Sequence, residues 1–233
     1  MIYKSSKNNN NFPKKLKKLS SKQKNISDDF MKYWHEVLRS KYTIVDKFNH
    51  KFIVNSRPNR FKTVLEIGAG DGEHLYYEKL SKKKLKNYYA LDIRKNMLTR
   101  LINEYKDVNV VNGDCQKKTN FKSNFFDRVI AIHILEHLPN LPKALNEINR
   151  VIKTSGTFQI VIPCEGSLAY SIARKISAER IFKKRYEMDY EWFIKREHIN
   201  SPLEIFTELE EYFKIDTIRF FPINIIPLKF CNL

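Results

Sequence analysis

The chain has 233 residues, of which 42% are hydrophobic and 13% aromatic, and its formal net charge is +17. This composition excludes a wholly disordered chain, and no run of about 18 apolar residues is present that could span a bilayer. The length fits one α/β domain with additions, so a second folded domain is not required.

Much of the positive charge is concentrated near the N-terminus. Residues 1–25 contain eight lysines and no acidic residue. We interpret this stretch as a disordered basic tail. The alternative is an arm that binds RNA or an anionic membrane surface, because Leu16 and Leu19 stand among the lysines. No basic-plus-aromatic recognition module follows residue 25, so a nucleic-acid partner is the less favoured interpretation.

The three cysteines, Cys115, Cys164 and Cys231, are odd in number and far apart. This usage is typical of a reducing compartment and not of a disulfide framework. The N-terminus is polar and lacks the apolar segment of a secretory signal. We therefore predict a cytoplasmic protein without a transmembrane segment, and the oligomeric state is left open.

An N-terminal helical cap is predicted over residues 26–60. Its first half, residues 26–50, has apolar side chains at three- and four-residue spacing, which is the period of a helix. These side chains are Phe30, Tyr33, Trp34, Val37 and Leu38.

The remainder, residues 61–233, is predicted to form one α/β domain. Strands are expected at 64–67, 88–93, 108–111, 126–135 and 157–162, and helices at 73–85, 96–105 and 142–152. This alternation predicts a parallel, doubly wound sheet.

The C-terminal region is predicted to add one helix and two strands. Ser201-Pro202-Leu203-Glu204 is a capping box with proline at the first helical position, so a helix should run from there to about Tyr212. Residues 214–221 and 223–228 are expected to form two last strands, the second at a sheet edge because it contains a proline.

The segment Val64 to Leu75 carries most of the functional information. A short apolar run breaks into Gly68, Gly70 and Gly72, which is typical of a buried strand that turns through a glycine loop into a helix. A dinucleotide-binding loop would need a third glycine where Glu73 stands. Glu66, two residues before the first glycine, would repel a pyrophosphate and suits a cofactor with a cationic portion.

In these residues the chain resembles the class I S-adenosylmethionine-dependent methyltransferases, in particular their small-molecule, type 11-like branch. The resemblance covers roughly residues 60–165 and includes acids at the ends of the second and third predicted strands, together with Phe126-Asp127-Arg128-Val129 and Leu135-Glu136-His137-Leu138. It implies a Rossmann-like seven-stranded sheet with helices on both faces and an antiparallel last strand. It also implies S-adenosylmethionine as cofactor, bound by Glu66, Gly68, Ala69, Gly70, Gly72, Asp92, Ile93, Asp114, Cys115 and His133.

Each acid also has an ordinary structural interpretation. Asp92, 20 residues after Gly72, is expected to accept hydrogen bonds from the ribose hydroxyls, but it could instead be the N-cap of the next helix. Asp114 is expected near the adenine amino group, and a turn aspartate is an equal alternative. Asp127 we assign to structure, because it begins a buried strand.

An oxygen acceptor of the methyl group must lose a proton, and histidine is the side chain best suited to take it. Three histidines are predicted near the mouth of the sheet: His133, His137 and His198. We propose His198 and His137 as the catalytic residues. Alternatively, His198 is an ordinary histidine of a surface loop, and His137 caps the next segment together with Glu136. Residues 167–197, dense in basic and aromatic side chains, are predicted to form a helical lid. Such a lid suits an anionic or sugar-linked acceptor.

His133-Ile-Leu-Glu136-His137 spells the H-x-x-E-H pattern of one class of zinc protease, which we reject because it spans a strand end. Some similar quinone-pathway O-methyltransferases hold a divalent cation with Glu-x-x-Glu-His at this place. Here His133 replaces the first acid, and magnesium prefers oxygen ligands, so no metal site is predicted.

The sequence therefore predicts S-adenosylmethionine-dependent methyl transfer to a small-molecule or glycan-type acceptor at oxygen. The alternatives are an RNA methyltransferase and a non-catalytic module that binds the cofactor. Cys164 stands where RNA cytosine-C5 enzymes keep their nucleophile, but the companion Pro-Cys after the fourth strand is missing.

Overall fold

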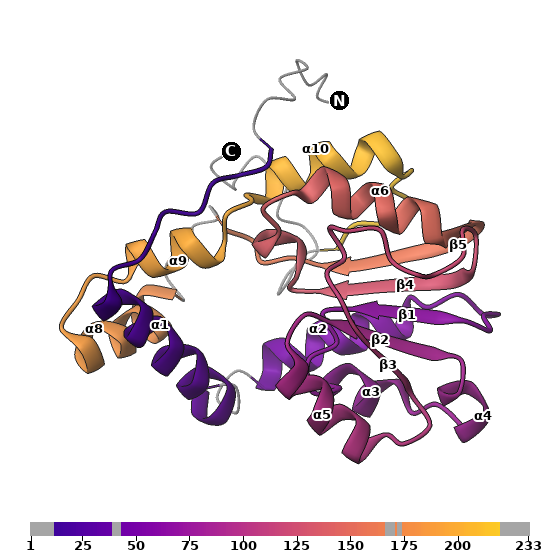
Figure 1. The fold of residues 1–233 in the computed structure, drawn as a ribbon, viewed down its shortest axis with the longest axis horizontal. Coiled ribbons are helices and arrows are strands. Elements are labelled where there is room, and N and C mark those ends of the chain that lie inside the picture. The colour runs from indigo at the N-terminus through magenta and orange to yellow at the C-terminus, as the bar shows by residue number, and fades with distance from the viewer. Residues whose placement is uncertain (1–11, 39–42, 166–170, 172–173, 220–233) are drawn as a thin grey trace.

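A parallel sheet of five strands forms the centre of the described structure (Figure 1). The computed structural model describes residues 12–38, 43–165, 171 and 174–219. The strands lie in the order β3-β2-β1-β4-β5 and all neighbouring pairs are parallel. Their bounds are β1 Val64–Ile67, β2 Tyr88–Asp92, β3 Asn109–Asn112, β4 Phe126–Ile132 and β5 Ile152–Val161. The winding direction reverses between β1 and β4, and in such sheets a ligand binds at that reversal, beyond the carboxyl ends of the strands.

Helices cover both faces of the sheet, as predicted. Alternate residues of a strand point to opposite faces, so Leu65 packs with α6 (Leu141–Val151) and α10 (Pro202–Tyr212), whereas Val64 packs on the other face. The elements on that second face are α2 (Thr43–Asn55), α3 (Glu73–Glu78), α4 (Lys82–Leu85) and α5 (Lys95–Glu104). This arrangement is the predicted Rossmann-like α/β fold.

Several predicted boundaries are wrong. The helix expected over 73–85 is split into α3 and α4 because Lys79 has a left-handed backbone, with φ of 48°. The strand expected over 126–135 ends at Ile132, because His133 has φ of 52°. β5 begins directly after α6 at Ile152 and not at residue 157, with a register irregularity where it meets β4.

The two additional strands expected after α10 are not confirmed. Residues 214–219 have no regular secondary structure, and the remainder of both predicted strands lies outside the described residues. The described sheet therefore has five strands, and the predicted seven-stranded sheet with an antiparallel last strand stays a prediction.

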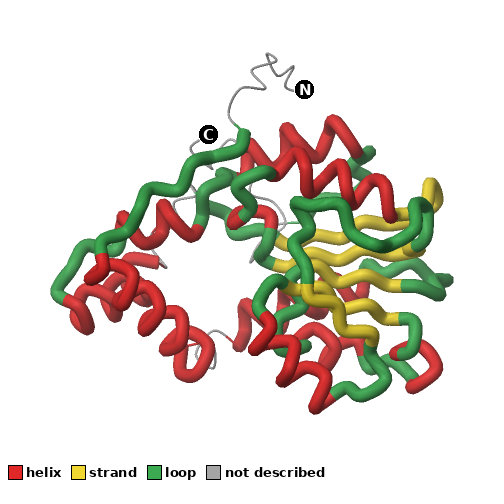
Figure 2. The backbone as a smooth tube through the Cα atoms, in the orientation of Figure 1, coloured by secondary structure: helices red, strands yellow, loops and turns green. Residues whose placement is uncertain are grey.

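The N-terminal helix and the predicted lid form one body, which we call the helical lobe and define as residues 21–38 and 174–197. It contains α1 (Ser21–Tyr33), the π-helical turns η2 (Trp34–Leu38) and η5 (Lys175–Glu179), α8 (Arg180–Tyr186) and α9 (Glu191–Glu197). Phe30 of α1 packs edge-on against Phe182 and Phe193, with ring centroids 5.0 and 5.2 Å away. Figure 2 shows these helices set apart from the yellow strands.

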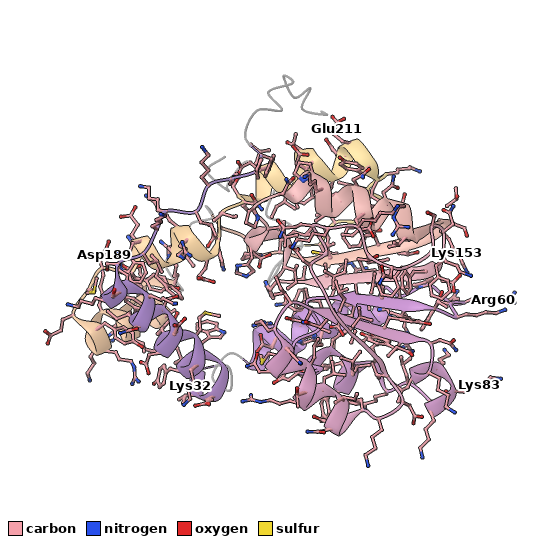
Figure 3. All side chains as sticks on the ribbon, viewed as in Figure 1. Lys32, Arg60, Lys83, Lys153, Asp189 and Glu211 are labelled. Carbon is pink, nitrogen blue, oxygen red and sulfur yellow. The ribbon has the colours of Figure 1, made fainter. Side chains whose placement is uncertain are left out.

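The helical lobe lies opposite the carboxyl ends of the strands. Figure 3 labels Arg60, Lys83 and Lys153, which precede or begin β1, β2 and β5, at the far end of the sheet from the lobe residues Lys32 and Asp189. The strands therefore run toward the lobe. A ligand at the switch point would lie between the sheet and the lobe, as expected of a lid.

The described part of the basic N-terminal segment lies against the domain. The Lys14 amide donates to Pro139 O at 2.8 Å, and its ammonium group contacts Ile199 O and Glu204 Oε1 at 2.7 and 2.5 Å. Helix α1 begins at Ser21 after the N-cap Ser20. The expectation of a disordered tail to residue 25 is therefore wrong for residues 12–25, because these contacts and this capping box order them, while residues 1–11 lie outside the described part. Among the described residues no helix has the length and apolar character needed to cross a membrane.

Candidate functional site

The glycine loop joins β1 to α3 and is held against the end of β2. The Gly68 and Ala69 amides donate to Leu91 O at 2.8 and 3.1 Å, and the Gly70 amide donates to Asp92 Oδ2 at 2.9 Å. All three glycines have positive φ, at 70°, 55° and 91° for Gly68, Gly70 and Gly72. Side chains avoid this backbone region, so the loop conformation requires glycine.

Space is unevenly distributed around these glycines. A Cβ on Gly68 would lie 1.9 Å from Ile134 Cδ1, so that face of the loop is filled by protein. A Cβ on Gly70 would meet only Arg94 Nη2, at 3.8 Å. The Gly70 side is therefore the face on which a ligand can approach bare main chain.

Asp92 ends β2 beside this loop, as predicted. Besides Gly70, its carboxylate accepts from the Arg94 amide at 2.8 Å and from the Arg94 guanidinium at 3.2 Å. Burial opposes ionisation of Asp92, but these hydrogen bonds outweigh it and lower its pKa. The side chain is thus an ionised acceptor at the strand end, at present covered by a half-exposed arginine.

Glu66 does not lie in the loop. Its side chain is buried and its Oε2 accepts from the Tyr88 hydroxyl at 2.7 Å. Burial raises the pKa of Glu66 to about 8, so the carboxyl group is mostly protonated at neutral pH. The prediction that Glu66 offers a negative charge to a cationic cofactor therefore disagrees with its placement in the core.

The residues predicted around the adenine lie at the ends of β2 and β3. Ile93 is an exposed apolar side chain directly after β2. Asp114 accepts from the Gln116 amide and side chain at 2.9 and 3.1 Å, which is the turn geometry weighed as its alternative role. Cys115 is buried, and burial raises the pKa of its thiol to about 12. A buried thiol with a raised pKa stays protonated, so Cys115 can line a pocket but does not act as a nucleophile.

Asp127 has the structural role predicted for it. Its Oδ2 accepts from the Lys62 and Thr63 amides at 2.8 and 2.9 Å, and its Oδ1 pairs with Lys153 at 2.7 Å. These contacts fasten the chain entering β1 to the start of β4, at the end of the sheet away from the glycine loop.

The three predicted histidines do come together, around a buried carboxylate. Glu136 is 1% exposed, and the nearest ring nitrogens are His133 Nδ1 at 3.3 Å and His137 Nε2 at 3.9 Å. The rings of His137 and His198 lie 5.1 Å apart at 73°. We call Glu136, His137 and His198 the imidazole–carboxylate cluster.

Residues from distant segments hold this cluster and the neighbouring His133 in place. His198 Nδ1 lies 2.5 Å from Glu165 Oε1, and His133 Nε2 lies 2.9 Å from Asn49 Nδ2. The Asn200 side-chain amide donates to Leu135 O and Leu138 O, both at 2.8 Å. Sequence reasoning missed all three partners. Only Glu165 carried a signal, since it follows the fifth strand at its carboxyl end.

Residues 65–160 match the family model described as a methyltransferase domain. This match, which covers less than half of the chain, identifies a methyltransferase domain of the S-adenosylmethionine-dependent class within residues 65–160. A solved structure of similar fold is an S-adenosylmethionine-dependent methyltransferase of Thermotoga maritima described as a possible histamine N-methyltransferase. It has a TM-score of 0.55 and 16% identity, over 77% of this chain and 78% of that one.

Two curated relatives of this methyltransferase domain are uncharacterized proteins of Methanocaldococcus jannaschii. One is 36% identical over 107 residues, which are 45% of this chain and 42% of the relative. The other is 31% identical over 136 residues, which are 58% of this chain and 49% of the relative. The chain thus spans less than half the length of each of these two relatives.

Proposed function

We propose that this chain transfers the methyl group of S-adenosylmethionine to a small-molecule or glycan-type acceptor, at oxygen. The observation that carries the proposal is the contact between the glycine loop and the segment that bears the histidines. β1 and β4 are paired through Ile67 and Ala131, and the Ile134 side chain lies directly against Gly68. The cofactor loop and the imidazole–carboxylate cluster therefore share one edge of the sheet.

On the cofactor side, we assign Asp92 to the two ribose hydroxyls. Arg94 would have to turn away for both carboxylate oxygens to become acceptors, and a half-exposed side chain can do so at small cost. The exposed Ile93 and the buried Cys115 would line the adenine, with Asp114 near its amino group. Gly68, Ala69, Gly70 and Gly72 would approach the amino-acid portion, whose sulfonium carries the methyl group.

On the acceptor side, we assign His137 and His198 to the hydroxyl that loses its proton. Methyl transfer is an in-line displacement, in which the acceptor oxygen attacks the methyl carbon and the carbon–sulfur pair passes to sulfur. Catalysis then depends on positioning and on excluding water. The helical lobe, opposite the strand ends, would supply that cover.

The lobe also supports an anionic or sugar-linked acceptor. Residues 174–196 contain eight Lys or Arg and four acidic residues. One acid from outside this stretch offsets part of the excess, because Arg185 pairs with Asp29. The pairs of Lys183 with Glu179 and of Lys195 with Glu191 lie within the stretch. The buried thiol Cys115 is compatible with the cytoplasmic location that we propose.

Transfer of a radiolabelled methyl group tests this proposal. The purified chain is incubated with labelled S-adenosylmethionine and either the low-molecular-mass or the RNA fraction of a cell extract. We expect label in the small-molecule fraction, and none with an Asp92→Ala variant. Label in RNA alone would support the RNA methyltransferase alternative, and cofactor binding without any transfer would support the non-catalytic module.

His198→Ala separates the acceptor side from the cofactor side. We expect turnover to fall by about 100-fold or more, as for loss of a positioned proton-transfer group, with an unchanged dissociation constant for S-adenosylmethionine. A variant that turns over normally would remove His198 from the mechanism.

A further inference from the structure

The carboxylate of Glu136 is buried without hydrogen-bond donors. Both of its oxygens are inaccessible to solvent, and among the described residues neither has a hydrogen-bond partner of acceptable geometry. An ionised group in this state is costly unless a positive charge compensates for it. The His133 ring, 3.3 Å from Oε1, supplies part of that compensation.

The two neighbouring imidazoles are oriented as metal ligands are. His137 Nδ1 lies 2.5 Å from Glu197 O, and His198 Nδ1 lies 2.5 Å from Glu165 Oε1. Each Nδ1 therefore carries the proton donated to that oxygen, and the lone pair is left on Nε2. Metal-binding histidines in proteins usually donate their other ring N–H to a carbonyl or carboxylate in this way.

The three residues are also close enough to share one ion. One ligand atom from each of Glu136, His137 and His198 lies within 4.8 Å of the others. Ligands of a single zinc ion, at about 2.0–2.2 Å from the metal, lie about 3.3 Å apart. Small side-chain rotations would therefore complete the site.

We infer that Glu136, His137 and His198 bind a divalent transition-metal ion of the zinc class. Two imidazoles and one carboxylate, with a position left for another ligand, form the donor set of catalytic zinc sites and of related iron(II) sites. Magnesium would not choose two nitrogen ligands. The sequence alone predicted no metal, because His133 stands in place of the first acid of the Glu-x-x-Glu-His pattern. His198 and Glu165 join the cluster only through the fold.

The inference deepens the proposed function. The chemical role of the ion rests on that function, whereas the binding of the ion does not. The remaining position would hold the acceptor hydroxyl oxygen and lower its pKa, so that its proton leaves to water. The oxygen then attacks the methyl carbon while the carbon–sulfur bond breaks. His198 would then take no proton itself, and its role would change from the base assigned above to a ligand of the ion that activates the acceptor.

Cobalt(II) titration of chelator-treated protein tests the inference without an acceptor. The wild type should bind one Co²⁺ per chain, with visible absorption bands of a site of low coordination number, and Zn²⁺ should displace it. Glu136→Gln and His198→Ala should abolish the bands. Glu165→Gln, which changes the hydrogen-bond partner of His198 Nδ1, should weaken Co²⁺ binding about 10- to 100-fold.

Two controls keep this test decisive. Glu147→Gln changes another largely buried glutamate, in α6, and should leave the Co²⁺ titration unchanged. Calorimetric titration with S-adenosylmethionine shows whether each variant is folded, and cluster variants should bind it as the wild type does. The inference fails if the wild type binds no Co²⁺ or if Glu136→Gln binds it equally well. A wild type that binds Co²⁺ but does not bind S-adenosylmethionine would instead overturn the proposed function and leave the metal site standing.

Discussion

Replacement of Glu66 by glutamine should stabilise the protein at alkaline pH. Burial raises the pKa of this carboxyl group from 4.5 to about 8. The unfolded chain loses the proton near pH 4.5, whereas the folded chain keeps it until about pH 8. The stabilising contribution is therefore complete below pH 4.5 and is lost as the pH rises through 8.

The size of this pH-dependent loss of stability follows from the pKa of Glu66 in the unfolded and in the folded chain. At about 1.4 kcal/mol for each pKa unit, the rise from 4.5 to about 8 corresponds to roughly 5 kcal/mol lost across the interval. A glutamine side chain at this position has no proton to lose, and its oxygen can still accept from the Tyr88 hydroxyl. The free energy of unfolding of Glu66→Gln, relative to wild type, should therefore increase by several kcal/mol from about pH 5.5 to about pH 8.5.

Urea unfolding followed by circular dichroism at several pH values measures this difference. Glu147→Gln is the matched control. Burial of Glu147 opposes ionisation, but hydrogen bonds from Arg150 and Thr119 outweigh it and lower its pKa. That variant should lose stability at neutral pH and gain none as the pH rises. Parallel stability curves for wild type and Glu66→Gln over this range would show that burial does not raise the pKa of Glu66.

Three further predictions concern the glycine loop and α10. Arg94→Ala should tighten S-adenosylmethionine binding by about fivefold or more, because it removes a half-exposed guanidinium that competes for the buried Asp92 carboxylate, and an ion pair with one exposed partner is worth about 1 kcal/mol; weaker binding by calorimetry would contradict this. Gly70→Ala should lower the free energy of unfolding by about 1–2 kcal/mol, because alanine is strained in the left-handed region, and it should weaken cofactor binding by about tenfold or more. Gly68→Ala should lower Tm further, because its Cβ would overlap the Ile134 side chain. Ser201→Ala should cost about 1 kcal/mol in urea unfolding, since it removes the capping box of α10; an unchanged midpoint would show that the cap contributes nothing.

Features encoded by short stretches of sequence were predictable. The loop of Gly68, Gly70 and Gly72 depends on backbone angles that only glycine tolerates, and the structure has these angles. Asp92 follows from its place at the end of a strand that neighbours this loop. The capping box at Ser201 and Glu204 is formed with both of its hydrogen bonds. In the glycine loop and the capping box the determining residues lie within a few positions of one another, whereas Asp92 was predicted from the family resemblance, 20 residues after Gly72.

Features that depend on distant residues were not predictable. The burial of Glu66 and its bond with Tyr88 exist only once β1 and β2 are paired. The pairing of His198 with Glu165 joins residues 33 positions apart, and that of His133 with Asn49 joins residues 84 apart. The left-handed Lys79, which splits a predicted helix, carries no residue-type signal such as glycine.

The helical lobe shows the same limit at a larger scale. The sequence predicted a cap over 26–60 and a lid over 167–197 as separate parts. Packing of Phe30 against Phe182 and Phe193 joins α1 to the segment predicted as a lid, while α2 covers the sheet. A periodic apolar face shows that a helix is covered, but it does not identify the partner.

Calorimetric titration of S-adenosylmethionine into the wild type and Asp92→Ala tests whether the carboxyl end of β2 forms the cofactor site. We predict that the wild type binds one cofactor per chain. Asp92→Ala should bind about 100-fold more weakly, because two hydrogen bonds to a charged acceptor contribute about 1.5 kcal/mol each. A wild type that gives only heats of dilution, or a variant that binds as tightly as the wild type, would contradict the assignment of this strand end as the cofactor site.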